Sequence, residues 1–265
     1  MGFGRHQTRY GDIKRIRPGV DQSMGQKTIG KVRVDCHYLA KSKWGVLQDA
    51  DAWALYVDLK IQQPPDQKLA NATITFTFNK DVSIASAAST TNDEIEGPYI
   101  ECFGPKAVDG KAAKKTITNE YHGTPTLSAG SVSIGGVGLN RTTSYEDWSR
   151  WKIRGEIWAP PATGIALYRQ AQWTIEENVF ENEATHNNRV HVGLILKHDL
   201  KTFFCDIQIE GKLRGLSRLY LFSSHGNEVF RRRLEPIQNK QEKLDEVAKD
   251  LDKELTLING GSTES

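Results

Sequence analysis

Histidines and carboxylates gather in one stretch of the sequence, where they could support metal binding or proton transfer. The histidines are His186, His191 and His198, and the carboxylates are Glu176, Glu177, Glu181 and Glu183. Their spacing matches neither HExxH nor another zinc signature, and on a strand His191 faces away from Val190 and Leu194. We therefore expect solvated or edge histidines, with no metal and no cofactor. An enzyme with a site near His186 and His191 is the third functional hypothesis.

Basic residues form two groups that could bind phosphate. The groups are Arg5, Arg9, Lys14, Arg15 and Arg17 near the N-terminus, and Arg231, Arg232 and Arg233 near the other end. Residues 1–28 hold six basic and two acidic residues, a net charge of +4, and could bind nucleic-acid or lipid phosphates. The run at 231–233 is short, so we expect it to pair with the acidic C-terminal helix or to be solvated. Phosphate contact is its alternative.

Aromatic residues offer a further candidate binding surface. The tryptophans of the second half are Trp148, Trp151, Trp158 and Trp173. We expect most of them to pack in the core or across strands. Because Trp148 and Trp158 have the opposite strand parity to Trp151, they are the candidates for an exposed platform for a sugar or base.

The glycine cluster and the nucleophiles give weaker signals. Backbone amides around Gly130, Gly135, Gly136 and Gly138 could cradle phosphate, but neither GK[ST] nor an apolar-periodic helix follows, so we expect a hairpin, bulge or close sheet contact. The chain has no GxSxG, and Cys36 and His37 are adjacent on a strand and point apart. The catalytic residues are therefore unknown, and the sequence favours a protein that is not an enzyme.

Period-two alternation of apolar and polar residues dominates the chain and predicts half-buried antiparallel strands. Strands are expected over 31–38, 53–61, 72–78, 98–103, 115–121, 126–134, 151–157, 168–176, 189–197, 202–213 and 218–222. Residues 104–114 have turn chemistry. Many short strands at fairly regular spacing predict an all-β fold, an antiparallel β-sandwich, with a division into two sub-sheets near 86–97 as an open alternative.

The two ends of the chain depart from this pattern. Residues 1–28 are rich in glycine and charge, which predicts a flexible basic arm ahead of a sandwich domain over 29–234. From 235 to 258 the apolar residues recur every three, four or seven positions, which predicts one amphipathic α-helix, followed by a tail over 259–265. We expect the apolar stripe of the helix to dock on the sandwich; pairing with a second copy is the alternative.

The compartment follows from the cysteines and the N-terminal sequence. Three widely spaced cysteines, Cys36, Cys102 and Cys205, give no disulfide framework, and Cys205 lies in an apolar strand pattern that predicts a buried thiol. No apolar segment marks a secretory signal or a membrane span. We expect an intracellular protein that is cytoplasmic, or alternatively nuclear, and not secreted.

The second half also resembles a group of uncharacterised ascomycete fungal proteins. The resemblance covers residues 95–215 and rests on Trp148-x-x-Trp151-x-Ile153-x-Gly155, Trp173-Thr-Ile-Glu-Glu-Asn178, the strand 190–197 and Phe203-Phe204-x-x-Ile207-x-Ile209-x-Gly211-Lys212. It implies a fungal, intracellular, β-rich protein and transfers no functional residue.

These observations leave three hypotheses from different classes. We expect a non-catalytic binding or interaction protein built on a β-sandwich, with a protein partner or self-association. The alternative is a nucleic-acid-associated or capsid-like structural protein that uses the N-terminal arm, and the third is the enzyme near His186 and His191.

Overall fold

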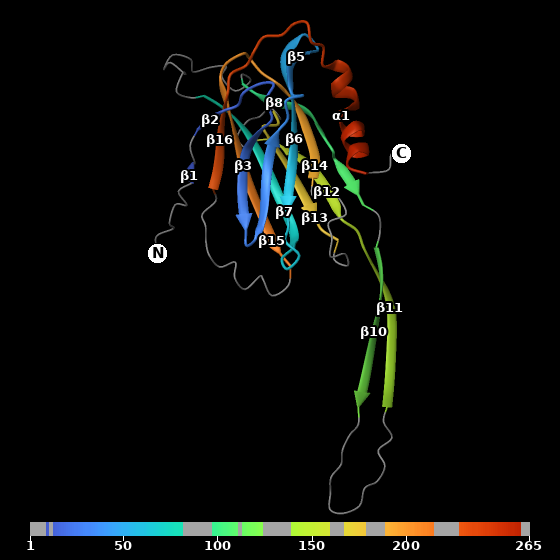
Figure 1. The fold of residues 1–265 in the computed structure, drawn as a ribbon. Helices are drawn as coiled ribbons and strands as arrows, with labels where there is room; N and C mark the ends of the chain where they lie inside the picture. The colour runs from blue at the N-terminus through green and yellow to red at the C-terminus, as the bar shows by residue number, and fades with distance from the viewer. Residues whose placement is uncertain are drawn as a thin grey trace, which may run out of the picture.

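The computed structural model describes residues 9–10, 13–81, 97–110, 113–123, 139–159, 167–178, 189–214 and 228–260 of the 265-residue chain. Within them the chain forms two packed sheets, a separate two-stranded hairpin and one helix (Figure 1). The all-β, largely antiparallel sandwich predicted from the alternation is confirmed.

An eight-stranded sheet forms one layer, in the order β1-β16-β15-β7-β13-β12-β9, with β2 also paired to β16. Its strands are β1 (Arg9–Tyr10), β2 (Lys14–Arg15), β7 (Leu69–Lys80), β9 (Ala107–Asp109), β12 (Lys152–Trp158), β13 (Gln170–Glu176), β15 (Phe203–Leu213) and β16 (Glu228–Leu234). The short strands β1 and β2 pair with β16 in parallel, whereas the other neighbours are antiparallel.

A six-stranded sheet forms the second layer, in the order β3-β4-β6-β14-β8, with β5 paired to β6. Its strands are β3 (Gln22–Ile29), β4 (Val32–Tyr38), β5 (Lys43–Leu47), β6 (Ala50–Gln62), β8 (Tyr99–Gly104) and β14 (Arg189–Lys197). Each layer takes strands from both sides of residues 82–96, which lie outside the described part of the chain, so the alternative division into two sub-sheets near 86–97 is not observed.

The inner faces of the two sheets form one hydrophobic core, because each alternating strand sends every second side chain inward. The inward-facing side chains of β6 are every second residue from Trp53 to Ile61. They pack against Phe203, Cys205 and Ile207 of β15 in the other sheet, and all of them are buried. Trp44 stacks on Trp53 with ring centroids 4.9 Å apart. The buried, free thiol predicted for Cys205 is confirmed.

Helix α1 (Asp245–Ile258) covers part of the outer face of the six-stranded sheet (Figure 1). Leu251 and Leu255 are fully buried against Ala54, Tyr56 and Ile195 of the sheet. Docking, which the sequence favoured over pairing with a second copy, is therefore confirmed for this stripe. No helix within the described ranges is long and apolar enough to cross a membrane.

The prediction that the helix starts at residue 235 is wrong by ten residues. Glu242 and Leu244 instead run along β5: the Val46 amide donates to the Glu242 carbonyl (2.9 Å), and the Leu244 amide donates to the Val46 carbonyl (2.9 Å). Strand-like pairing with β5 thus replaces helical hydrogen bonds at 242–244, while the Leu244 side chain is still buried under α1.

The arm predicted for residues 1–28 is also partly wrong, because β2 and β3 belong to the two sheets. Met24 and Ile29 are buried and hold β3 in place. The sequence did not predict this strand because the segment is rich in glycine. The turn predicted for 104–114 contains β9 and the start of the next strand. The strands expected at 126–134 and 218–222 lie outside the described residues.

A long hairpin extends from the sandwich (Figure 1). It consists of β10 (Ala113–Gly123) and β11 (Leu139–Ser149), paired antiparallel over their whole length from Ala113↔Ser149 to Gly123↔Leu139. Each strand has 11 residues, which corresponds to about 37 Å of extended chain. The hairpin forms a sheet of its own and pairs with no other described strand.

Candidate functional site

The parallel pairing of β2 with β16 brings the two predicted phosphate-binding groups together. Arg232 is in register with Lys14, and Arg233 is in register with Arg15. A pocket of about 640 Å³ opens at this junction. It is lined by Lys14, Arg15, Ile16, Arg17, Pro18, Gln22, Ser23 and Arg232. We call it the basic pocket; four of the eight described residues that line it are cationic, and none of the eight is acidic.

Main-chain and amide hydrogen bonds fix the walls of the basic pocket. The Ile16 amide donates to the Arg233 carbonyl (3.2 Å), and the buried Ile16 side chain anchors the segment to the core. Gln22 Nε2 donates to the carbonyls of Arg17 (2.8 Å) and Val20 (3.3 Å). These bonds close the turn at residues 17–20, so the arm segment around Arg17 has a defined position beside β16.

Arg232 differs from the other cations of the basic pocket because its side chain is buried, with 6% of the residue exposed. Its Nη1 donates to the Arg231 carbonyl (3.0 Å). Burial lowers the pKa of Arg232 from its usual value, although interaction with Cys205 acts in the opposite direction. The guanidinium is therefore partly desolvated before any ligand arrives, and a nearby anion would interact with it more strongly than in water.

The three consecutive arginines have three different environments. Arg231 forms a bidentate pair with Asp206, at 2.7 Å and 2.6 Å, and its guanidinium lies 5.1 Å from the Phe204 ring centre. Arg233 lies 3.8 Å from Glu235, which also pairs with Arg15. The ion-pair partners that the structure gives Arg231 and Arg233 lie on β15 and just after β16 and not on α1, so the expected pairing with the helix is not observed for these two residues. Arg5 and the side chain of Arg9 lie outside the described residues.

His191 is a structural partner of a buried carboxylate rather than an edge histidine. Its strand, β14, lies between β6 and β8 inside the six-stranded sheet. His191 Nδ1 is 2.7 Å from Asp58 Oδ1, and Arg189 Nε is 3.5 Å from Asp58 Oδ2. Burial acts to raise the pKa of Asp58, but the hydrogen bond from His191 and the charges of His191, Arg189 and Lys60 outweigh it and lower the pKa.

His198 is a core histidine. It is 8% exposed and packs edge-on to Trp44, with ring centroids 5.2 Å apart. Its Nδ1 accepts a hydrogen bond from the Leu200 amide (3.2 Å). Burial lowers its pKa below the usual histidine value. His186 lies outside the described residues, and no cluster suited to a metal ion occurs within the described part of the chain.

Three of the four tryptophans have described side chains, and Trp158 has the exposure that strand parity predicted for it. Trp151 and Trp173 are buried, and Trp173 Nε1 donates to the Pro105 carbonyl (3.2 Å). Trp158 is 49% exposed, and Tyr168 nearby is 39% exposed. The two belong to adjacent segments, because the Arg169 amide donates to the Trp158 carbonyl (3.1 Å). The side chain of Trp148 and the glycine cluster 130–138 lie outside the described residues.

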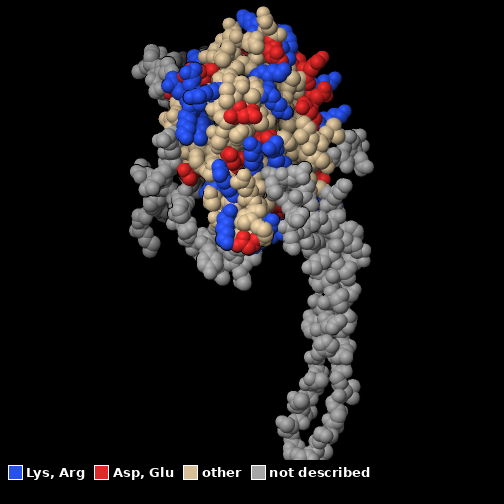
Figure 2. Space-filling model, in the orientation of Figure 1, with Lys and Arg blue, Asp and Glu red and all other residues tan. Residues whose placement is uncertain are grey.

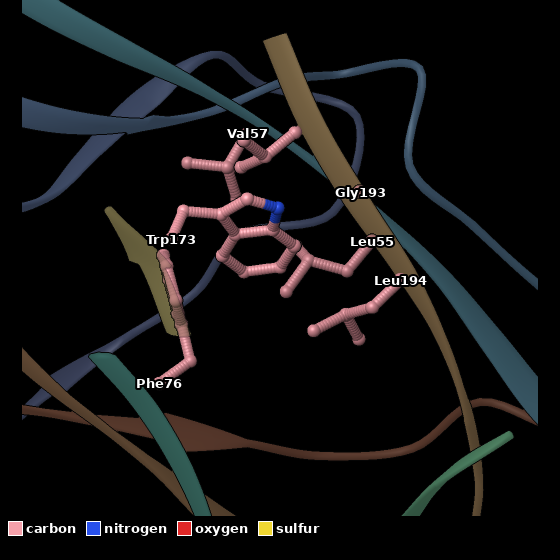
Figure 3. A pocket seen from close by; sticks show the side chains of 7 residues that line it. Leu55, Val57, Phe76, Trp173, Gly193 and Leu194 are labelled. Atoms are coloured by element: carbon pink, nitrogen blue, oxygen red, sulfur yellow. The ribbon is translucent and has the colours of Figure 1, made fainter. Parts of the chain in front are cut away.

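A gap between the sheets offers no ligand site (Figure 3). It is lined by Leu55, Val57, Phe76, Trp173, Val192, Gly193 and Leu194 and holds no space for a water molecule. With no polar side chain pointing into it, apart from the edge of the Trp173 indole, it is a packing gap of the core.

The β10–β11 hairpin is an element that the strand pattern predicted only in part, as a strand over 115–121. It continues from β9 and β12, which pair at the edge of the eight-stranded sheet. The Gly110 amide donates to the Trp151 carbonyl (3.0 Å), and Arg154 pairs with Asp109 at 2.7 Å. A Cβ atom at Gly110 would lie 2.0 Å from the buried Trp151 indole nitrogen. Close packing therefore fixes the base of the hairpin.

The comparisons with known proteins give no family. No family model matches the chain, and no curated protein matches it. Among solved structures, the membrane-inserted form of the NetB toxin of Clostridium perfringens is similar at 8% identity. The match covers 83% of this chain and 92% of that chain, with a TM-score of 0.23. At that TM-score the similarity carries no argument about this chain.

Proposed function

We propose that this chain is a non-catalytic interaction protein that assembles with further copies of itself through the β10–β11 hairpin. The observation that carries the proposal is the open hairpin: two 11-residue strands pair only with each other among the described strands. An isolated two-stranded hairpin is marginally stable in water. Each outer edge also presents a row of unpaired backbone groups that can accept another strand.

A second copy of the chain is the occupant that fits these edges. Its hairpin offers strands of equal length, so edge-to-edge pairing would satisfy all 11 positions. When two copies lie side by side in the same direction, β11 of one copy is adjacent and antiparallel to β10 of the next. Both edges of each hairpin are then used, which gives a head-to-tail interface that rotational symmetry can close into a ring.

The charge pattern of the hairpin supports this arrangement. Lys114 and Lys115 occupy positions near the base of β10, whereas Glu146 and Asp147 occupy positions near the base of β11. In adjacent copies the basic end of one strand meets the acidic end of the other. Opposite charges directly across a strand pair stabilise it, while like charges destabilise it.

Light scattering of the full-length protein during size-exclusion chromatography tests the proposal. We expect wild-type oligomers at micromolar concentration and monomers for the variant Lys114→Glu/Lys115→Glu. The variant Glu146→Lys/Asp147→Lys should be monomeric as well. Mixing the two variants should restore oligomers, because each edge then meets an edge of opposite charge. A wild-type protein that stays monomeric at all concentrations, with and without lipid vesicles, contradicts the proposal.

A second candidate function is insertion of the hairpin into a lipid bilayer. No charged residue occurs between His122 and Arg141, and Leu127, Ala129, Val132, Ile134 and Val137 are interspersed with serine and glycine in this stretch. Leu127 and Ala129 are two positions apart, as are Val132 and Ile134, which is the spacing of side chains on one face of a strand. Strands of about 9–11 residues are long enough to cross the hydrocarbon core.

Release of a dye from phosphatidylcholine vesicles tests this candidate. We expect wild-type protein to release the dye and Ile134→Asp to abolish release. Ser133→Asp is the matched control, because it places the same charge on the alternate parity and should retain most of the release. Equal loss in both variants, or no release by the wild type, counts against membrane insertion while leaving self-assembly in solution untouched.

A further inference from the structure

The basic pocket at the junction of β2 and β16 is independent of the hairpin. Figure 2 shows basic residues grouped over the side of the molecule where Figure 1 places β2 and β16. The structure combines two sequence segments separated by more than 200 residues, 14–17 and 232, in one recess. We propose that this recess is a binding site for a small ligand that carries phosphate groups.

The charges of the basic pocket are arranged for an anion. Lys14 and Arg17 are exposed, and neither forms an ion pair with an acidic residue of the described part of the chain. Arg15 shares Glu235 with Arg233, so this carboxylate already pairs with two guanidinium groups. Ser23 donates its hydroxyl hydrogen to Asp35 Oδ1 (2.5 Å), outside the lining set. An entering phosphate therefore meets cationic donors on several sides.

Arg232 gives the basic pocket a preorganised element. Its side chain is buried and its Nη1 is already bonded to the Arg231 carbonyl, so its orientation is fixed before a ligand binds. A desolvated guanidinium interacts strongly with phosphate, which its planar donors can bind in a bidentate manner.

The size and lining of the basic pocket favour a small ligand over a nucleic-acid strand. Its volume of about 640 Å³ is in the range of small-molecule sites. Among the described residues that line it, none is aromatic, whereas proteins that hold single strands stack bases on aromatic rings along an extended groove. The same phosphate chemistry could come from a free phosphorylated compound or from the headgroup of a phospholipid, and the experiment must separate these sources.

Calorimetric titration of the full-length protein with inorganic pyrophosphate tests the site. We expect saturable binding at low ionic strength and at least tenfold weaker binding for Lys14→Ala/Arg17→Ala. Both side chains are exposed, so this variant should fold, which its thermal unfolding will verify. Lys240→Ala removes an exposed charge outside the pocket and should change the affinity less than twofold. Arg17→Lys should retain part of the affinity.

Phosphatidic acid vesicles and a single-stranded RNA 20-mer are two further probes, which distinguish the sources of the phosphate and can contradict the proposal. Binding to phosphatidic acid vesicles but not to pyrophosphate, lost in the Lys14→Ala/Arg17→Ala variant, supports the site with a lipid headgroup as its ligand. Binding of neither probe overturns the proposal, as does equal binding by that variant and Lys240→Ala. Binding only to a single-stranded RNA 20-mer overturns it in favour of a nucleic-acid surface. All of these outcomes are independent of hairpin assembly.

Discussion

At the scale of single residues, partly buried polar groups of the six-stranded sheet bear on its stability. Asp58, His191 and Arg189 form one partly buried cluster on the outer face of the six-stranded sheet. Asn259, just after α1, brackets His191: its Oδ1 accepts from the His191 amide (2.9 Å), and its Nδ2 donates to the His191 carbonyl (2.7 Å). These two hydrogen bonds hold β14 and the end of the helix together.

Substitution of His191 tests how much its pairing with Asp58 contributes to the stability of the protein. We expect His191→Ala to lower the free energy of unfolding by about 1–3 kcal/mol, because it removes the closest partner of the buried Asp58 carboxylate and leaves the more distant charges of Arg189 and Lys60. In an Asp58→Asn background the same substitution should cost less. Urea unfolding of the two single variants and the double variant measures the coupling; additive effects would show that the pair contributes no interaction energy.

His198 should make the protein less stable as the pH falls. Its folded-state pKa is lowered by burial, with Asp51 and Asp199 acting weakly against that effect. Between the folded-state pKa and the usual value of 6.5, the unfolded state binds more protons, so stability falls as the pH falls through this window and levels off for this group below the folded-state pKa. Urea unfolding at several pH values should show a shallower pH dependence for His198→Gln than for the wild type. An unchanged slope would assign the effect to other groups.

At the scale of elements, close backbone approach determines how α1 meets the sheet. A Cβ atom at Gly104 would lie 2.7 Å from the Asp252 backbone, and one at Gly193 would lie 3.2 Å from a Leu255 methyl group. These two strand glycines therefore admit the helix. A glycine inside a strand pattern is the sequence signal for such an approach, but it does not reveal which element approaches.

Leu255 should be the residue on which helix docking depends most. We expect Leu255→Ala to destabilise the protein by about 2–5 kcal/mol, since it removes a fully buried side chain and leaves a cavity. Leu257→Ala is the matched control: the residue is two positions away and 50% exposed, so its truncation should change stability by less than about 0.5 kcal/mol. Thermal and urea unfolding measure both, and equal effects would contradict the docking of this stripe.

At the scale of the whole molecule, the sequence predicted layers better than it predicted connections. Alternation in strands such as β4, β6 and β15 identified their inward residues, because burial on one face imposes period two. It could not show that β2 joins β16, since parallel pairing of distant segments leaves no local pattern. The basic pocket was therefore represented in the sequence only as two separate groups of candidates. The start of the helix was predicted wrongly for a similar reason, because residues 242–244 form hydrogen bonds with the distant strand β5 in place of helical ones.

The separation of hairpin and sandwich predicts two units of very different local stability. Amides of β6 are paired on both sides by β4 or β5 and β14, so they should exchange with deuterium mainly through global unfolding. Amides of β10 and β11 belong to a two-stranded sheet with two open edges, so in the monomer they should exchange roughly 100-fold faster or more. Edge-to-edge assembly should slow hairpin exchange and leave β6 unchanged, as hydrogen–deuterium exchange with mass spectrometry can measure. If the amides of β10 and β11 exchanged as slowly as those of β6 in the monomer, the backbone groups at the hairpin edges would already be hydrogen-bonded. That result would contradict assembly through these edges.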